Sequence, residues 1–236
     1  MNNPRFLFSK IFLLFFVILL ASSCIKNDGS LSGDAKVRIF NTVISDTTKN
    51  FYFNNRLFND LTSVSALATA TNSSYFVVDA DKEYTIDARN SITARSSDTS
   101  IVTKFGLGLN YSIYYTKVNA TSGTKAKMVV YQDTVRPNAT MAKVMFINMG
   151  YTLGSAVQIT NRAKTFSDAL AYGKKSKYYE FTSIKNNQAT MLFNLADSTG
   201  VVDSLSFSGL ALGKVYTVIL EGAANGKLKE RLVSNN

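Results

Sequence analysis

Short runs in which apolar and polar residues alternate recur along most of this chain. Alternation with a period of two places every second side chain on one face of a strand, whereas a helix repeats every 3.6 residues. Asn54 and Asn55 stand between two such runs, and asparagine tolerates the positive φ of a tight hairpin turn. Residues 59–70, rich in alanine and leucine, are expected to form a loop. The predicted strands are 37–39, 51–53, 84–86, 111–115, 144–146, 157–159, 205–207 and 215–220.

The composition agrees with a β-rich fold. The chain has 236 residues, with 12 tyrosines and 16 phenylalanines but only 2 prolines. Aromatic residues are enriched in strands, and proline interrupts them. Turn-forming residues separate the predicted strands at intervals typical of a sandwich. We therefore expect an all-β protein made of antiparallel β-sandwiches.

The chain also contains an internal repeat. Residues 35–41, AKVRIFN, recur 107 residues later as residues 142–148, AKVMFIN. Further pairs, 103 to 105 residues apart, are 66–68 with 169–171, Ser73 with Ser176, Tyr75 with Tyr178, and Tyr111 with Tyr216. Matches in one order at nearly constant spacing predict two tandem domains, with loops absorbing the differences in spacing.

The boundary between the two copies is expected where Pro137 and polar neighbours interrupt the strand pattern. The expected domains are residues 35–134 and 139–236. Two polar segments, 87–104 and 160–177, are expected to be the longest loops and the places to look for ligand recognition. Disordered decoration without a ligand is the alternative interpretation, and it is the favoured one.

The repeated tyrosines have two interpretations. We expect them to pack in the sandwiches, with hydroxyl groups bonded at a sheet corner. A ligand-binding platform is the alternative.

The first residues have the pattern of an export signal. Arg5 and Lys10 accompany the uninterrupted apolar run 11–20, and small residues at 21–23 lead to Cys24, the only cysteine. The apolar run is shorter than the roughly 20 residues that span a bilayer as a helix. No second cysteine is present to form a disulfide.

This segment resembles a bacterial lipobox, with Leu20 one place further from Cys24 than in the common pattern. The resemblance implies a lipoprotein signal peptide at 1–23, cleavage before Cys24, and acylation of the Cys24 thiol and amino group. A plain secretory signal with an incidental cysteine is the alternative. Two or three acyl chains would hold the protein firmly to a membrane.

Residues 24–34 would then form the lipidated cysteine and a flexible tether that reaches on the order of 15–20 Å. We expect the bacterial outer membrane as the location. Acidic residues directly after a lipidated cysteine resemble a surface-export signal, and residues 26–28 carry one acid. The cell surface is favoured, and the periplasmic face stays open.

The charge balance is basic. Without Arg5 and Lys10, the 26 basic residues fall to 24 against 16 acidic ones, so the formal net charge is +8. Such a balance favours polyanions. The bases are scattered, however, except at 174–177 and 227–231, and solvated strand faces explain most of them. No nucleic-acid-binding motif is present, so nucleic acid is not an expected partner.

Catalytic chemistry has few candidates. The chain has no histidine, and its single cysteine is assigned to lipid. This excludes Ser-His-Asp triads, Cys-His pairs and zinc sites built on histidine or cysteine. Asp79, Asp81 and Glu83 would share one face of an extended segment and are weak candidates for a Ca²⁺ site, although a turn also uses aspartate. We expect no enzyme activity, no catalytic residue and no cofactor.

The repeated motifs resemble a family of unknown function, DUF4397. The resemblance rests on 35–41 and 142–148, on the central Ala-Leu-Ala with its serine and tyrosine, and on 212–218, LGKVYTV. In the first copy Tyr111 is followed by Ser-Ile instead of Thr-Val. The resemblance covers residues 35–236 and implies immunoglobulin-like β-sandwiches in envelope lipoproteins of the Bacteroidota. It implies no activity and no site residue.

Several aspartates are followed by serine or threonine, and this resembles the pattern that Bacteroidota modify with O-glycans. Turns in β-proteins produce the same pattern, because these side chains bond to nearby backbone. A glycan would be bulky and solubilising. The candidate O-glycosylation residues are Thr47, Thr134, Ser198 and Ser204.

The sequence therefore predicts a membrane-anchored envelope lipoprotein with a non-catalytic binding or structural role, toward a glycan, an envelope protein or a surface. A fimbrial or adhesin component is the alternative, and it requires an edge strand that is vacated or donated. A surface glycan hydrolase is a distant alternative, and it requires paired acids about 5–10 Å apart.

Overall fold

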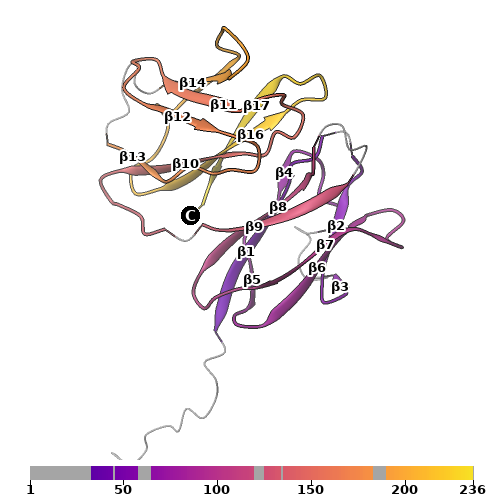
Figure 1. Cartoon of the computed structure of the whole chain (residues 1–236). Helices are drawn as coiled ribbons and strands as arrows, with labels where there is room; N and C mark the ends of the chain where they lie inside the picture. The colour runs from indigo at the N-terminus through magenta and orange to yellow at the C-terminus, as the bar shows by residue number, and fades with distance from the viewer. Residues whose placement is uncertain are drawn as a thin grey trace, which may run out of the picture. The chain divides into compact units, whose positions relative to one another are not determined.

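The computed structural model describes residues 33–44, 46–57, 65–119, 125–133, 135–182 and 190–235. Strands dominate these ranges, and none of the described elements is a helix (Figure 1). A search of the same ranges finds no helix long and apolar enough to cross a membrane. The expected all-β fold is confirmed.

The first repeat forms two sheets that face each other. Its strands are β1 (Asp34–Asn41), β2 (Lys49–Phe53), β3 (Arg56–Leu57), β4 (Thr71–Asn72), β5 (Phe76–Asp79), β6 (Glu83–Asn90), β7 (Ser97–Lys104), β8 (Asn110–Lys117) and β9 (Ala126–Gln132). One sheet has the order β4-β1-β8-β9, with β5 also paired to β1, and the other has the order β3-β2-β6-β7.

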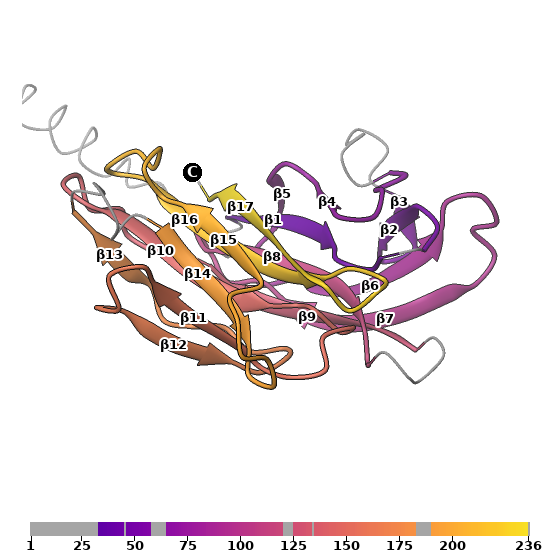
Figure 2. The ribbon, with the colours of Figure 1, turned by 90° about the horizontal axis from the view of Figure 1, so that it is seen from above.

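The second repeat has the same strand order. Its strands are β10 (Ala142–Asn148), β11 (Val157–Asn161), β12 (Ser167–Leu170), β13 (Tyr179–Phe181), β14 (Thr190–Leu195), β15 (Asp203–Ser206), β16 (Val215–Gly222) and β17 (Leu228–Ser234). They form sheets β13-β10-β16-β17 and β12-β11-β14-β15, which lie over one another (Figure 2). Each strand here has a counterpart at the same sheet position in the first repeat.

The connectivity differs from the immunoglobulin-like order that the resemblance to DUF4397 implied. In an immunoglobulin sandwich the first two strands belong to one sheet, whereas β1 and β2 lie in different sheets, as do β10 and β11. The sheets are also not purely antiparallel, because β1 runs parallel to β8 and β10 runs parallel to β16. Parallel neighbours cannot be joined by a tight hairpin, so the chain between them crosses to the other sheet and returns.

The local chemistry of the repeat explains why both copies fold alike. The Asn41 side-chain amide donates to the Leu67 carbonyl at 3.1 Å, and the Asn148 amide donates to the Leu170 carbonyl at 2.8 Å. Both asparagines are fully buried. A buried amide is costly unless it is hydrogen-bonded, so this bond ties the end of the first strand to the Ala-Leu-Ala segment in each copy.

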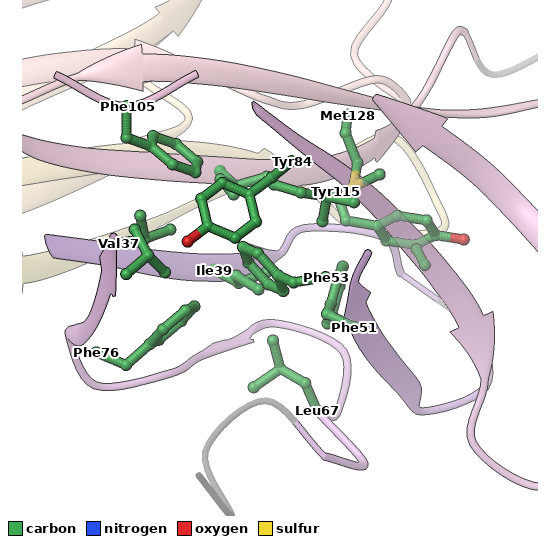
Figure 3. Close-up of a cluster of buried hydrophobic side chains, with 14 of the residues drawn as sticks. Val37, Ile39, Phe51, Phe53, Leu67, Phe76, Tyr84, Phe105, Tyr115 and Met128 are labelled. Carbon is green, nitrogen blue, oxygen red and sulfur yellow. The ribbon is translucent and has the colours of Figure 1, made fainter. Parts of the chain in front are cut away.

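Apolar side chains from the two sheets of each repeat meet in a core. In the first core, shown in Figure 3, Val37 and Ile39 of β1 face Phe51 and Phe53 of β2. The rings of Phe53 and Phe76 pack edge to face with centroids 5.5 Å apart, a favoured aromatic geometry. These positions alternate along β1 and β2, which is the pattern that predicted the strands.

A third cluster joins the two repeats, and we call this contact the seam. It consists of Phe40, Tyr114, Ile147, Met149 and Ile219, all nearly inaccessible to solvent. Phe40 and Tyr114 come from the first repeat and stack with ring centroids 4.7 Å apart. Because their outward faces are covered, the strands β1, β8, β10 and β16 are buried on both sides.

Candidate functional site

Several sequence-predicted residues fall outside the described ranges. These are Cys24 with the preceding segment 1–23, and Thr134. Their roles stay predictions.

The other candidate glycosylation residues are exposed. Thr47 lies between β1 and β2, and its hydroxyl accepts hydrogen bonds from Lys49 Nζ at 3.2 Å and Asn90 Nδ2 at 2.9 Å. Ser198 lies in the turn after β14, whereas Ser204 lies within β15 and not in the turn that its neighbours indicated. A modifying enzyme would reach Ser198 without displacing a strand.

The acidic cluster does not form one extended face. Asp79 ends β5, Glu83 begins β6, and Asp81 lies in the turn between them with a φ of 61°. Asp79 pairs with Lys82 at 3.3 Å, and Asp81 pairs with Lys104 at 3.7 Å. No group of three or more potential metal ligands occurs among the described residues. The turn therefore accounts for these aspartates through local bonds.

Of the two segments expected to be long loops, 87–104 is largely strand, whereas 160–177 is mostly loop and turn, as expected. Residues 87–104 hold the end of β6 and all of β7, joined by a short turn, and 160–177 contains β12. Strand β7 was not predicted because its serines and threonines lower its hydrophobicity. Its side chains nevertheless alternate between the two faces, since Ile101 packs against the core and Val102 is 58% exposed. An edge strand needs only one apolar face, so this alternation was the available signal.

The repeated tyrosines do bond at equivalent corners. The Tyr111 hydroxyl accepts from the Gly106 amide at 3.0 Å, and the Tyr216 hydroxyl accepts from the Ala211 amide at 3.0 Å. In each case the tyrosine bonds to backbone just upstream of its own strand. This agrees with the packing interpretation of these two tyrosines.

At the seam lies a buried ion pair that sequence reasoning missed. Arg38 is 2% exposed and Asp133 4% exposed, and Arg38 Nη2 lies 3.4 Å from Asp133 Oδ2. Arg38 Nε donates to Ser112 Oγ at 2.9 Å, and the hydroxyls of Ser112 and Tyr75 donate to Asp133 Oδ2 at 2.5 Å and 2.6 Å. Burial first, and then the charge and hydrogen bond of Asp133, raise the pKa of the Tyr75 hydroxyl, while the Arg38 charge opposes this shift. The carboxylate is thus held by three donors from one repeat.

The same arginine reaches the second repeat. Its Nη1 donates to the Ser234 carbonyl at 2.9 Å, and its Nη2 donates to Asn235 Oδ1 at 2.6 Å. Asn235 also bonds to Thr217 Oγ1 at 3.0 Å. The Tyr178 hydroxyl donates to the Asp133 carbonyl at 3.3 Å, so the equivalent tyrosines 75 and 178 meet at one aspartate. Arg38 therefore joins the first strand of the chain to its last residues.

Three lysine amines also lie over tyrosine rings of the opposite repeat. The pairs, with distances from Nζ to ring centroid, are Lys117 over Tyr151 at 5.9 Å, Lys127 over Tyr172 at 4.5 Å, and Lys175 over Tyr131 at 5.1 Å. We call these six residues the lysine–tyrosine ridge. A cation over an aromatic face at this range is attracted by the ring, so both repeats contribute charge and rings to one surface.

The tyrosines of the ridge are fixed by hydrogen bonds across the seam. The Tyr172 hydroxyl donates to the Lys117 carbonyl, and the Tyr131 hydroxyl donates to the Gly173 carbonyl at 2.7 Å. Lys175 Nζ donates to the Gln132 carbonyl at 3.2 Å. Burial lowers the pKa of the Lys127 amine. The rings are therefore held in place, with the amines above them.

A carboxyl pair links β15 and β17 in the second repeat. Burial, then the hydrogen bond and charge of Asp203, raise the pKa of Glu230 from its ordinary 4.5 to about 7. The folded chain thus binds this proton more tightly than the unfolded chain. This tighter proton binding by Glu230 stabilises the folded chain fully below pH 4.5, and the stabilisation is lost as the pH rises to about 7.

Replacing Asp203 with asparagine is expected to flatten this pH dependence. We expect the Asp203→Asn chain to gain on the order of 0.5–1 kcal/mol over the native chain at pH 8, after allowance for solvent screening. At pH 4 the two chains should be equally stable. Urea unfolding at both pH values measures the difference, and identical pH slopes would contradict the coupling.

The comparison with known proteins does not assign this chain to a family. Neither the family models searched nor the curated proteins contain a match to this chain. The resemblance to DUF4397 therefore stays a prediction.

Proposed function

We propose that this protein is a lipid-anchored envelope protein with a non-catalytic binding or structural role. In this proposal the acylated Cys24 attaches the chain to the outer membrane, and the two repeats present one joined surface to a glycan or an envelope protein. The tandem domains correspond to the DUF4397 type.

The observation that carries the proposal is the seam. Arg38, Asp133 and Asn235 are buried polar residues, and their hydrogen bonds join the two repeats. Burying charges costs free energy unless they are paired. Asp133 Oδ2 and the Arg38 guanidinium have partners, whereas Asp133 Oδ1 has none among the described residues, and the bonds that Arg38 makes to the second repeat favour a fixed relation between the repeats. A fixed pair of sandwiches suits a protein that presents a surface spanning both.

Anchoring is tested through Cys24. In bacteria that express the full chain and are fed labelled palmitate, we expect the native chain to take up label and the Cys24→Ala chain to take up none. The Ser22→Ala chain is the matched control and should keep its label. A labelled Cys24→Ala chain, or an unlabelled native chain, would contradict the lipid anchor.

A further inference from the structure

We propose that the lysine–tyrosine ridge binds an anionic polysaccharide, a linear sugar polymer that carries carboxylate, sulfate or phosphate groups. This inference rests on the proposed binding role and names the class of ligand. It assigns the contact to a surface that neither repeat forms alone.

The ridge has the length of an extended polymer segment. Lys127 lies near the start of β9, where it is opposite Thr116 of β8. Lys175 binds the carbonyl of Gln132 at the other end of β9. With a rise of about 3.4 Å per residue, the five steps from 127 to 132 cover about 17 Å. Lys117 and Lys127 therefore lie near one end of β9 and Lys175 near the other, so the three amines are spread along the length of this strand.

The charge on the ridge is not neutralised by the protein. Within the described ranges, a carboxylate oxygen lies within 4.0 Å of the Nζ atoms of four lysines, which are Lys49, Lys82, Lys104 and Lys143. In the same ranges, no carboxylate oxygen lies that close to the Nζ atom of any of the three ridge lysines. Lys125 and Lys174, which neighbour the ridge lysines in sequence, are exposed as well. A surface with unpaired charge of one sign attracts ligands of the opposite sign.

The amines are also ordered before any ligand arrives. Each lies over a ring, and two of those rings are fixed by their hydroxyl groups. A free lysine side chain loses rotamer entropy when it binds, and a side chain that is already placed loses less. The ridge lysines should therefore bind anions better than lysines elsewhere on the surface.

The geometry favours a sugar polymer over single-stranded nucleic acid. Single-stranded nucleic acid binds by stacking its bases on open aromatic faces, and here the amines occupy the faces of Tyr131, Tyr151 and Tyr172. An anionic lipid surface also attracts exposed bases, and the vesicle arm of the test below distinguishes it from a sugar polymer. A linear anionic polymer can reach amines at both ends of β9.

The test uses the full chain purified in detergent and measures its affinity for polygalacturonate, with dextran as the neutral polymer. We expect the native chain to bind polygalacturonate and not dextran. Replacing Lys117, Lys127 and Lys175 with glutamine should weaken binding about 10- to 100-fold. The matched control replaces three exposed lysines elsewhere. These are Lys36, Lys214 and Lys227, and affinity should stay within about 2-fold of the native value.

The remaining variants and probes make the outcome decisive. A Lys→Arg version of the ridge keeps charge and ring contact and should retain binding, which separates loss of the site from loss of the fold. Equal loss in the ridge and control variants would show attraction by net charge alone and overturn the proposal. Ridge-dependent binding to phosphatidylglycerol vesicles or single-stranded DNA, without binding to polygalacturonate, would also overturn it. Binding to dextran alone would overturn the ridge proposal and leave the general binding role standing.

Discussion

Replacing Arg38 with methionine is expected to lower the free energy of unfolding by about 3–5 kcal/mol, because one charge of a buried pair is left without its partner. Asp133 would keep its donors from Ser112 and Tyr75 but lose its cation. The contacts of Arg38 with Ser234 and Asn235 would also be lost. Urea unfolding followed by tyrosine fluorescence measures the change.

The double variant Arg38→Met with Asp133→Leu is the control for this result. Replacing both members of a buried ion pair by apolar residues is often neutral, so the double variant should recover most of the lost stability. The chain itself supports the methionine, since Met145 occupies the equivalent position in the second repeat and is 1% exposed. An Arg38→Met chain as stable as the native one would contradict the role of the ion pair.

Replacing Phe146 with alanine is expected to cost about 3–5 kcal/mol, through lost burial and the cavity left behind. Phe146 is fully buried at the centre of the second core. Its ring lies 6.1 Å from the ring of Phe207 and 6.4 Å from that of Phe193, measured between centroids. Thermal or urea unfolding of the variant provides the measurement.

Ile39 is the equivalent of Phe146 in the first repeat and offers the comparison. Ile39→Val removes one buried methyl group and should cost about 0.5–1.5 kcal/mol. A Phe146→Ala cost no larger than that of Ile39→Val would mean that the second core does not depend on its central ring.

Much of the fold follows from alternation along the sequence. The runs 37–39, 51–53 and 215–220 all lie in strands, as predicted. Asn54 and Asn55 form the predicted turn, with φ values of 50° and 61°. Periodicity describes one strand at a time, however, and it does not specify which strands pair. The parallel pairing of β1 with β8 therefore could not be predicted from it.

The buried contact between the repeats was not predicted from the sequence, for a different reason. An arginine in an alternating strand is expected to face solvent, whereas Arg38 is buried among residues of both repeats, including Tyr75 and Asn235. The signal was present in the repeat itself, where AKVRIFN has arginine and AKVMFIN has methionine at the same place. The lysine–tyrosine ridge also combines residues from both repeats, such as Lys127 and Tyr172, so sequence spacing alone does not bring it together.

Digestion of intact cells with proteinase K most directly tests the proposal that this chain is a lipid-anchored module displayed at the cell surface. Cells that express the full chain are treated before or after lysis, and the chain is detected with an antibody against the β-repeats. We predict that the protein disappears from intact cells while a periplasmic marker survives. Protection until the cells are lysed would contradict surface display and place the binding role inside the envelope.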